Sequence, residues 1–229
     1  MRYLYVMVSR TDTGFARLIR RFTGCYYNHA AISFDCDLRQ LYSFARRAYD
    51  LPLSACLTRE SPLMYTRGQG DAQIVLYRLP VPDERFIAAR RTVQMMLRDG
   101  GYIYYNVWSV FTYPLTRGLP AYKAQTCSEF TAGILRIAGL RLDRPDCRYH
   151  PEDFTHLLEG LEVYRGSLAA YCGENRRLDG DPEYLRRHSL LQIAGCSLRT
   201  LACAADRSLF ERPSGLPDVT GQYFAHTHR

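Results

Sequence analysis

A helix start with a cysteine at its first position is the feature that most constrains this chain. In Gln125-Thr126-Cys127-Ser128-Glu129-Phe130, Thr126 and Glu129 have the spacing of a capping box. The pattern predicts Thr126 at the N-cap and Cys127 at the first helical position, facing the positive end of the helix dipole. This environment lowers the pKa of a thiol and favours the nucleophilic thiolate. Cys127 is therefore a candidate nucleophile, although most cysteines are simply small buried apolar residues.

The predicted helix has one apolar stripe, and Cys127 lies along it. The stripe contains Phe130, Ile134, Ile137 and Ala138, at spacings that bring side chains to one face of a helix. Cys127 is therefore expected to point toward whatever element the helix packs on. A base carried by that element would complete a catalytic dyad.

His29 is the best candidate for this base. It begins the run His29-Ala30-Ala31-Ile32-Ser33-Phe34, which is typical of a buried strand where a polar ring would otherwise be out of place. The alternative is a histidine that only makes a structural hydrogen bond in the core. Nothing in the sequence brings the other histidines to Cys127: His150 precedes Pro151 and suits an N-cap or loop, and the rest are His156, His188, His226 and His228.

The hydrophobic pattern predicts an α+β domain over residues 1–165 and a partly helical extension over 166–229 with a loose tail. The pattern indicates strands over 3–8, 28–35, 40–47, 72–80 and 161–166. It indicates helices from a cap at Thr11, Asp12 or Thr13 to Gly24, over 83–97, over 125–139 and from Pro151. Residues 50–72 are interpreted as a loop because prolines and glycines interrupt them. Residues 102–122 are interpreted as an aromatic connection, in which Tyr104 and Tyr105 either line a substrate groove or pack on the core.

The composition favours a globular protein and disfavours several other classes. The 229 residues are 47% apolar and 23% charged, without a secretory signal or a long apolar run, so we expect a cytoplasmic protein with no membrane span. Eight cysteines without a Cys-x-x-Cys pair favour free thiols in a reducing compartment. The net charge of +7 suits acidic partners, but ten of the arginines occur as five doublets, which are typical of a solvated helix face, and no nucleic-acid reading motif accompanies them. Nucleic-acid binding is therefore disfavoured.

Taken together, these motifs resemble the circularly permuted NlpC-type papain-like hydrolases, in particular the YiiX-like branch. The resemblance rests on the ordered set NHAAISFD, LYSFARR, TCSEF and Pro151-Glu152-Asp153, and covers roughly residues 1–165. It implies a permuted papain-like fold in which the helix bearing Cys127 packs on an antiparallel sheet bearing His29. It also implies amidase, peptidase or acyl-transfer chemistry through a thioester, with no metal or cofactor. The substrate would be an amide or ester of a peptide or lipid.

The chain departs from this family where a third polar residue would orient the histidine. The strand after His29 has Tyr42-Ser43-Phe44, and a three-residue connection would put Ser43 on the same face as His29. Ser43 is thus the predicted orienting residue, or else an ordinary strand serine. The weak orienter keeps open a catalytically inactive papain-like fold used as a binding module.

A zinc-stabilised nucleic-acid module is a further alternative, with Cys25, His29 and Cys36 as ligands. Their spacing matches no closed structural zinc site, and no fourth ligand is evident. The sequence therefore predicts no metal.

Overall fold

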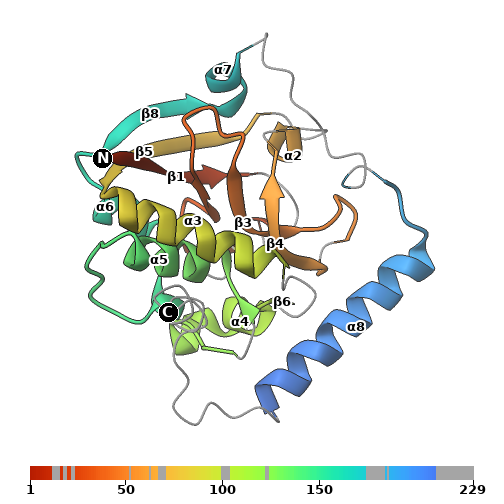
Figure 1. The fold of residues 1–229 in the computed structure, drawn as a ribbon. Coiled ribbons are helices and arrows are strands. Elements are labelled where there is room, and N and C mark those ends of the chain that lie inside the picture. The colour runs from red at the N-terminus through yellow and green to blue at the C-terminus, as the bar shows by residue number, and fades with distance from the viewer. Residues whose placement is uncertain are drawn as a thin grey trace.

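The computed structural model describes residues 1–11, 16–17, 20–21, 24–51, 53–61, 63–66, 71–98, 104–121, 124–173, 184 and 186–209. Its centre is a six-stranded antiparallel sheet in the order β4-β3-β2-β1-β5-β8 (Figure 1). The strands are β1 (Arg2–Arg10), β2 (His29–Ser33), β3 (Leu41–Arg46), β4 (Ala55–Glu60), β5 (Gln73–Val81) and β8 (Glu162–Ser167). A short parallel pair, β6 (Tyr104–Tyr105) and β7 (Ala124–Gln125), lies outside this sheet.

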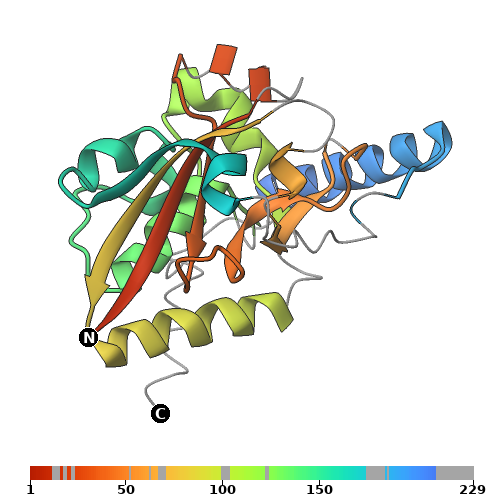
Figure 2. The same ribbon diagram turned by 90° about the horizontal axis from the view of Figure 1, so that it is seen from above.

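The helices flank the sheet and alternate with its later strands along the chain (Figures 1 and 2). They are α2 (Leu63–Thr66), α3 (Asp83–Arg98), α4 (Val107–Thr116), α5 (Cys127–Ile137), α6 (Asp153–Leu157), α7 (Leu168–Cys172) and α8 (Leu190–Leu209), with a 3₁₀ turn over Asp146–Arg148. The structure is thus mixed α+β, the class that the sequence pattern predicts.

Alternation along the strands divides the core between the two sheet faces. In β1, Leu4, Val6 and Val8 belong to the larger apolar cluster, whereas Met7 belongs to the smaller one. The larger cluster includes the buried faces of α3 and α5, and the smaller one includes Leu168 of α7. Both faces of the central strands are therefore covered, which explains why β1 and β2 are almost continuously apolar.

Most of the predicted elements are confirmed, but two predicted connections are wrong. Residues 50–72 contain the edge strand β4 and the short helix α2. The interval 102–122 contains α4, which begins where the Asn106 side chain accepts a hydrogen bond from the Ser109 amide. Prolines and glycines in these intervals do not exclude short elements, and Pro114 lies within the last turn of α4.

The packed part of the chain continues past residue 165. Strand β8 extends to Ser167, and Leu168 and Cys172 of α7 are buried. Beyond them, the His188 ring contacts the Asp50 carboxylate at 2.8 Å, while α8 exposes Leu190, Leu191 and Leu198. Figure 1 shows α8 at the periphery of the molecule. The tail from Pro213 and most of the predicted helix between Thr11 and Gly24 lie outside the described residues. No helix in the described ranges is both long and apolar enough to cross a membrane.

Candidate active site

Cys127 occupies the helix position that the sequence predicts. The Thr126 Oγ1 atom accepts a hydrogen bond from the Glu129 amide at 3.1 Å, and the Glu129 carboxylate accepts one from the Thr126 amide at 3.3 Å. This capping box fixes the first turn of α5, so that Cys127 follows directly after the N-cap. The side chain of Cys127 lies in the interior, with only 4% of the residue exposed.

The fold brings His29 to Cys127. Strand β2 begins at His29, and α5 packs against β2 and β3. The charge and ring nitrogen of His29 act on the Cys127 thiol, and so does the backbone amide of Ala30. The two residues are 98 positions apart in the chain, so only the packing of α5 on the sheet puts them together.

The paired environment stabilises the charged forms of both groups. Burial by itself would lower the pKa of His29, but the charges of Glu60 and of the Cys127 thiolate, with hydrogen bonds to both, raise that pKa well above its usual value. Burial likewise opposes ionisation of the thiol, yet the charge and hydrogen bond of His29 lower the pKa of Cys127 overall. A thiolate–imidazolium pair is the protonation state that these shifts favour.

Glu60 provides the carboxylate that orients the histidine, and the sequence analysis missed it. Its Oε1 atom lies 2.9 Å from Nε2 of His29, and its side chain is only 2% exposed. Because Nε2 faces Glu60, the nitrogen left for Cys127 is Nδ1. The available signal was weak: a short β-prone stretch, Cys56-Leu57-Thr58, between two prolines and ending in a charged pair.

Ser43 lies on the same face as His29, as predicted, and shares the contact with Glu60. Its Oγ atom lies 3.0 Å from Nε2 of His29 and donates a hydrogen bond to the Glu60 carboxylate. Ser43 is fully buried. The serine therefore helps hold the carboxylate against the ring, while Glu60 supplies the charge.

Tyr105 lies over the cysteine from the β6–β7 pair. Its residue is 6% exposed, and burial, with the charge and hydrogen bond of Cys127, raises the pKa of Tyr105 well above its usual value. The hydroxyl therefore keeps its proton and can donate to the sulfur. The backbone of Tyr104 pairs with Ala124, but its side chain lies outside the described part of the structure.

A partly open pocket gives access to the thiol. Its walls come from α4, from the first turn of α5 and from the loop before α6, and Tyr105 and Cys127 both line it. His150, which the sequence assigned to a cap or loop, is a buried part of this wall. Its amide does make a capping contact, donating to Asp153 Oδ2 at 2.7 Å. No sequence signal distinguished its ring from that of a loop histidine.

The remaining candidates do not form a second site. In the described part of the chain no three His, Cys, Asp or Glu side chains are arranged to hold a metal ion, so Cys25, His29 and Cys36 do not form a zinc site. All eight cysteines are free. His226 and His228 fall outside the described residues.

Gly118 allows the wall of the pocket to approach α4, which gives a prediction about stability. Gly118 has φ +111°, and a Cβ atom there would lie 1.9 Å from the Cys147 carbonyl oxygen. Gly139 has a similar φ of +101° but open space around it. We expect Gly139→Ala to cost about 1–3 kcal/mol through backbone strain, and Gly118→Ala to cost clearly more, because Cys147 must also move. Denaturant unfolding of the two variants measures the difference. Equal losses would show that the close approach is not needed.

Comparisons of the chain with protein-family models, with curated proteins and with solved structures returned no match. The chemistry of the site is therefore argued from its own residues.

Proposed function

We propose that this protein is a thiol hydrolase of the amidase, peptidase or acyl-transfer type, with a permuted papain-like fold. Cys127 is the nucleophile, His29 the general base and acid, and Glu60 the orienting carboxylate, assisted by Ser43. The observation that carries the proposal is the buried Cys127–His29–Glu60 arrangement at the start of a capped helix. The order of histidine before cysteine in the chain supports the permuted form.

The geometry suits acyl transfer in two steps. The Cys127 thiolate attacks the carbonyl carbon of an amide or ester, and the imidazolium of His29 gives its proton to the leaving amine or alcohol as the carbon–nitrogen or carbon–oxygen bond breaks. The product is a thioester on Cys127. His29, now neutral, takes a proton from water as that water attacks the thioester, which releases the acid and regenerates the thiolate.

The first turn of α5 offers donors for the oxyanion that forms during each attack. The Glu129 amide is satisfied by Thr126 Oγ1, and the Phe130 amide by the Thr126 carbonyl. Within the described residues, the amides of Cys127 and Ser128 have no acceptor, as expected for a helix start. Amides placed in this way stabilise a developing negative charge.

The alternative is a catalytically inactive papain-like fold used as a binding module, and the contacts of His29 disfavour it. That hypothesis followed from the lack of an adequate partner for the histidine. Glu60 now stands at 2.9 Å from His29 Nε2, so the orienter is a buried carboxylate. A buried carboxylate that contacts the histidine beside the thiol is what a working dyad requires, and this supports the hydrolase over the binding module.

The rate of thiol alkylation as a function of pH tests the proposal. With iodoacetamide and mass spectrometry, Cys127 is expected to react with an apparent pKa below the usual value of about 8.5, because His29 stabilises the thiolate. The His29→Ala variant is expected to have a higher apparent pKa at Cys127. Cys147 lines the same pocket and is an internal comparison, since burial and the charge of Glu129 raise the pKa of Cys147 to about 11. If Cys127 and Cys147 react alike at neutral pH, the binding-module alternative holds.

A further inference from the structure

Apart from the Cys127 thiolate, the described lining of the pocket holds no charged side chain, and this is informative about the substrate. Its walls include Val110 and Tyr113 of α4, together with Cys147, Tyr149, His150 and Pro151 of the loop before α6. Among the described lining residues none is Asp, Glu, Lys or Arg. The ion pairs of the neighbouring segment, Arg136 with Asp146 and Arg144 with Asp153, do not line the pocket.

His150 is the one ionisable imidazole in the described wall, and its surroundings keep it neutral. It is 6% exposed, and its ring lies 5.5 Å from that of Tyr113. Burial lowers the pKa of His150 to about 4. The Nδ1 atom accepts a hydrogen bond from the Glu152 amide at 3.4 Å, so the proton of the neutral ring lies on Nε2. In the described structure Nε2 has no partner, and it is not among the fully enclosed unpaired atoms, so it keeps access to the pocket.

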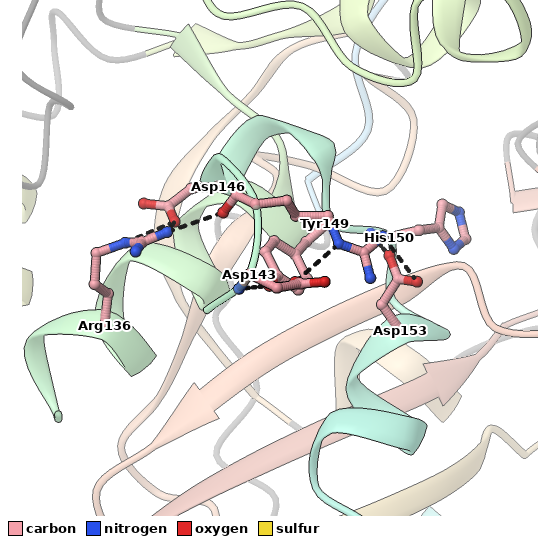
Figure 3. Close-up of polar contacts among 7 residues, drawn as sticks. Arg136, Asp143, Asp146, Tyr149, His150 and Asp153 are labelled. Atoms are coloured by element: carbon pink, nitrogen blue, oxygen red, sulfur yellow. Dashed lines mark hydrogen bonds and ion pairs between the residues drawn. The ribbon is translucent and has the colours of Figure 1, made fainter. Parts of the chain in front are cut away.

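A polar network holds this part of the wall in place (Figure 3). Arg136 of α5 contacts the Asp146 carboxylate at 2.7 Å, and the Tyr149 hydroxyl donates to Asp143 at 2.5 Å. The His150 amide donates to the Asp153 carboxylate at the start of α6. The loop is thus fixed at both ends to the helices on either side of it. The His150 ring is therefore pre-positioned, which lowers the entropic cost of using it to bind a ligand.

We infer that this pocket receives an uncharged acyl group of the substrate and that His150 donates its Nε2 proton to a neutral acceptor, such as a carbonyl oxygen, on that group. This inference rests on the proposed function, because it places the acyl group next to the Cys127 thiolate. The Cys127 thiolate is already paired with His29, and the described lining holds no other charged side chain. A carboxylate or ammonium group would therefore lose its hydration in the pocket without gaining a counter-ion of its own, which is costly. His150 is then a specificity-determining residue and takes no part in proton transfer.

A matched set of nitrophenyl esters tests the preference for an uncharged acyl group. Three acyl chains of equal length end in a methyl group, a carboxylate or an ammonium group. The burst of nitrophenolate gives the acylation rate, and mass spectrometry identifies the adduct on Cys127. The nitrophenyl ester whose chain ends in a methyl group is expected to react at least about 10-fold faster than either charged ester. This ratio corresponds to a loss of about 1.4 kcal/mol in binding when the charged end of the chain is desolvated. The use of both signs separates the pocket from the overall positive charge of the protein, which would favour the anion only.

The role of His150 is tested with a fourth ester that carries a ketone in the same chain. The wild type is expected to prefer this ester to the plain chain by about 5-fold or more, as one hydrogen bond provides. His150→Leu removes the donor and should abolish the preference, whereas His150→Gln keeps an N–H donor and should retain part of it. A merely structural role would change all rates together and leave the ratio unaltered.

The outcomes distinguish this inference from the proposed function. Equal rates for the three chains, or a faster charged ester, would overturn the uncharged pocket while Cys127 is still acylated. An unchanged ketone preference in His150→Leu would overturn the role of His150. If no ester acylates Cys127, although the protein is folded, the hydrolase proposal itself fails.

Discussion

Substitution of Cys127 by serine is expected to lower the rate of acyl-enzyme formation by a factor on the order of 10⁴ or more. The hydroxyl of serine is far less acidic than a thiol, so His29 and the first turn of α5 cannot hold it as an anion at neutral pH. Nitrophenyl ester hydrolysis with burst kinetics measures the loss. The change in volume is small, and Cys127 is a buried residue, so thermal unfolding should confirm that the variant still folds.

A matched variant shows whether the loss is specific to Cys127. Cys36 is exposed and does not line the pocket. The Cys36→Ser variant should therefore hydrolyse the ester at the wild-type rate. Hydrolysis that persists in Cys127→Ser at the wild-type rate would mean that another group reacts with the ester. The role of nucleophile would then have to be withdrawn.

Substitution of Glu60 by glutamine is expected to lower ester turnover by about 10²–10⁴-fold, since an amide cannot stabilise the imidazolium and can favour the wrong tautomer. The pH profile provides the sharper test. In the wild type, activity should rise with pH as the Cys127 thiol ionises, at a pKa that His29 lowers, and fall where His29 loses its proton. Because Glu60 raises the pKa of His29, the alkaline limb should move to lower pH in Glu60→Gln.

The same carboxylate links stability to pH with a definite sign. The pKa of His29 is raised in the folded state, so its protonation stabilises the fold fully below the unfolded pKa of about 6.5. This contribution is lost as the pH rises through the raised folded pKa. Denaturant unfolding of the wild type should therefore show a decline over this interval. The decline should be smaller in Glu60→Gln, in which only the Cys127 thiolate still raises the pKa of His29. An alkaline limb that does not move in Glu60→Gln would show that Glu60 does not govern His29, and Ser43→Ala would then be the next variant to examine.

The sequence by itself determined the parts of the site that depend on local structure. The capping box needs only Thr126 and Glu129 at a spacing of three, and it placed Cys127 at the start of α5. Side chains alternate between the two faces of the sheet along β2 and β3, and the short connection sets the register of the two strands. Together these features placed Ser43 on the same sheet face as His29. These features follow from hydrogen bonds and periodicities within a few residues, so no knowledge of the packing was required.

Only the tertiary structure decided which distant groups complete the site. Glu60 ends the edge strand β4, within an interval that the sequence pattern indicates as a loop. Pairing of β4 with β3 places Glu60 opposite Leu41, and from there its carboxylate reaches the ring of His29. His150 belongs to the pocket only because the loop before α6 is held against α5 and α4. The sequence does not distinguish a glutamate whose carboxylate is solvated from one whose carboxylate is buried against an imidazole. The difference between them lies in desolvation and in contacts between remote segments, and packing alone determines both.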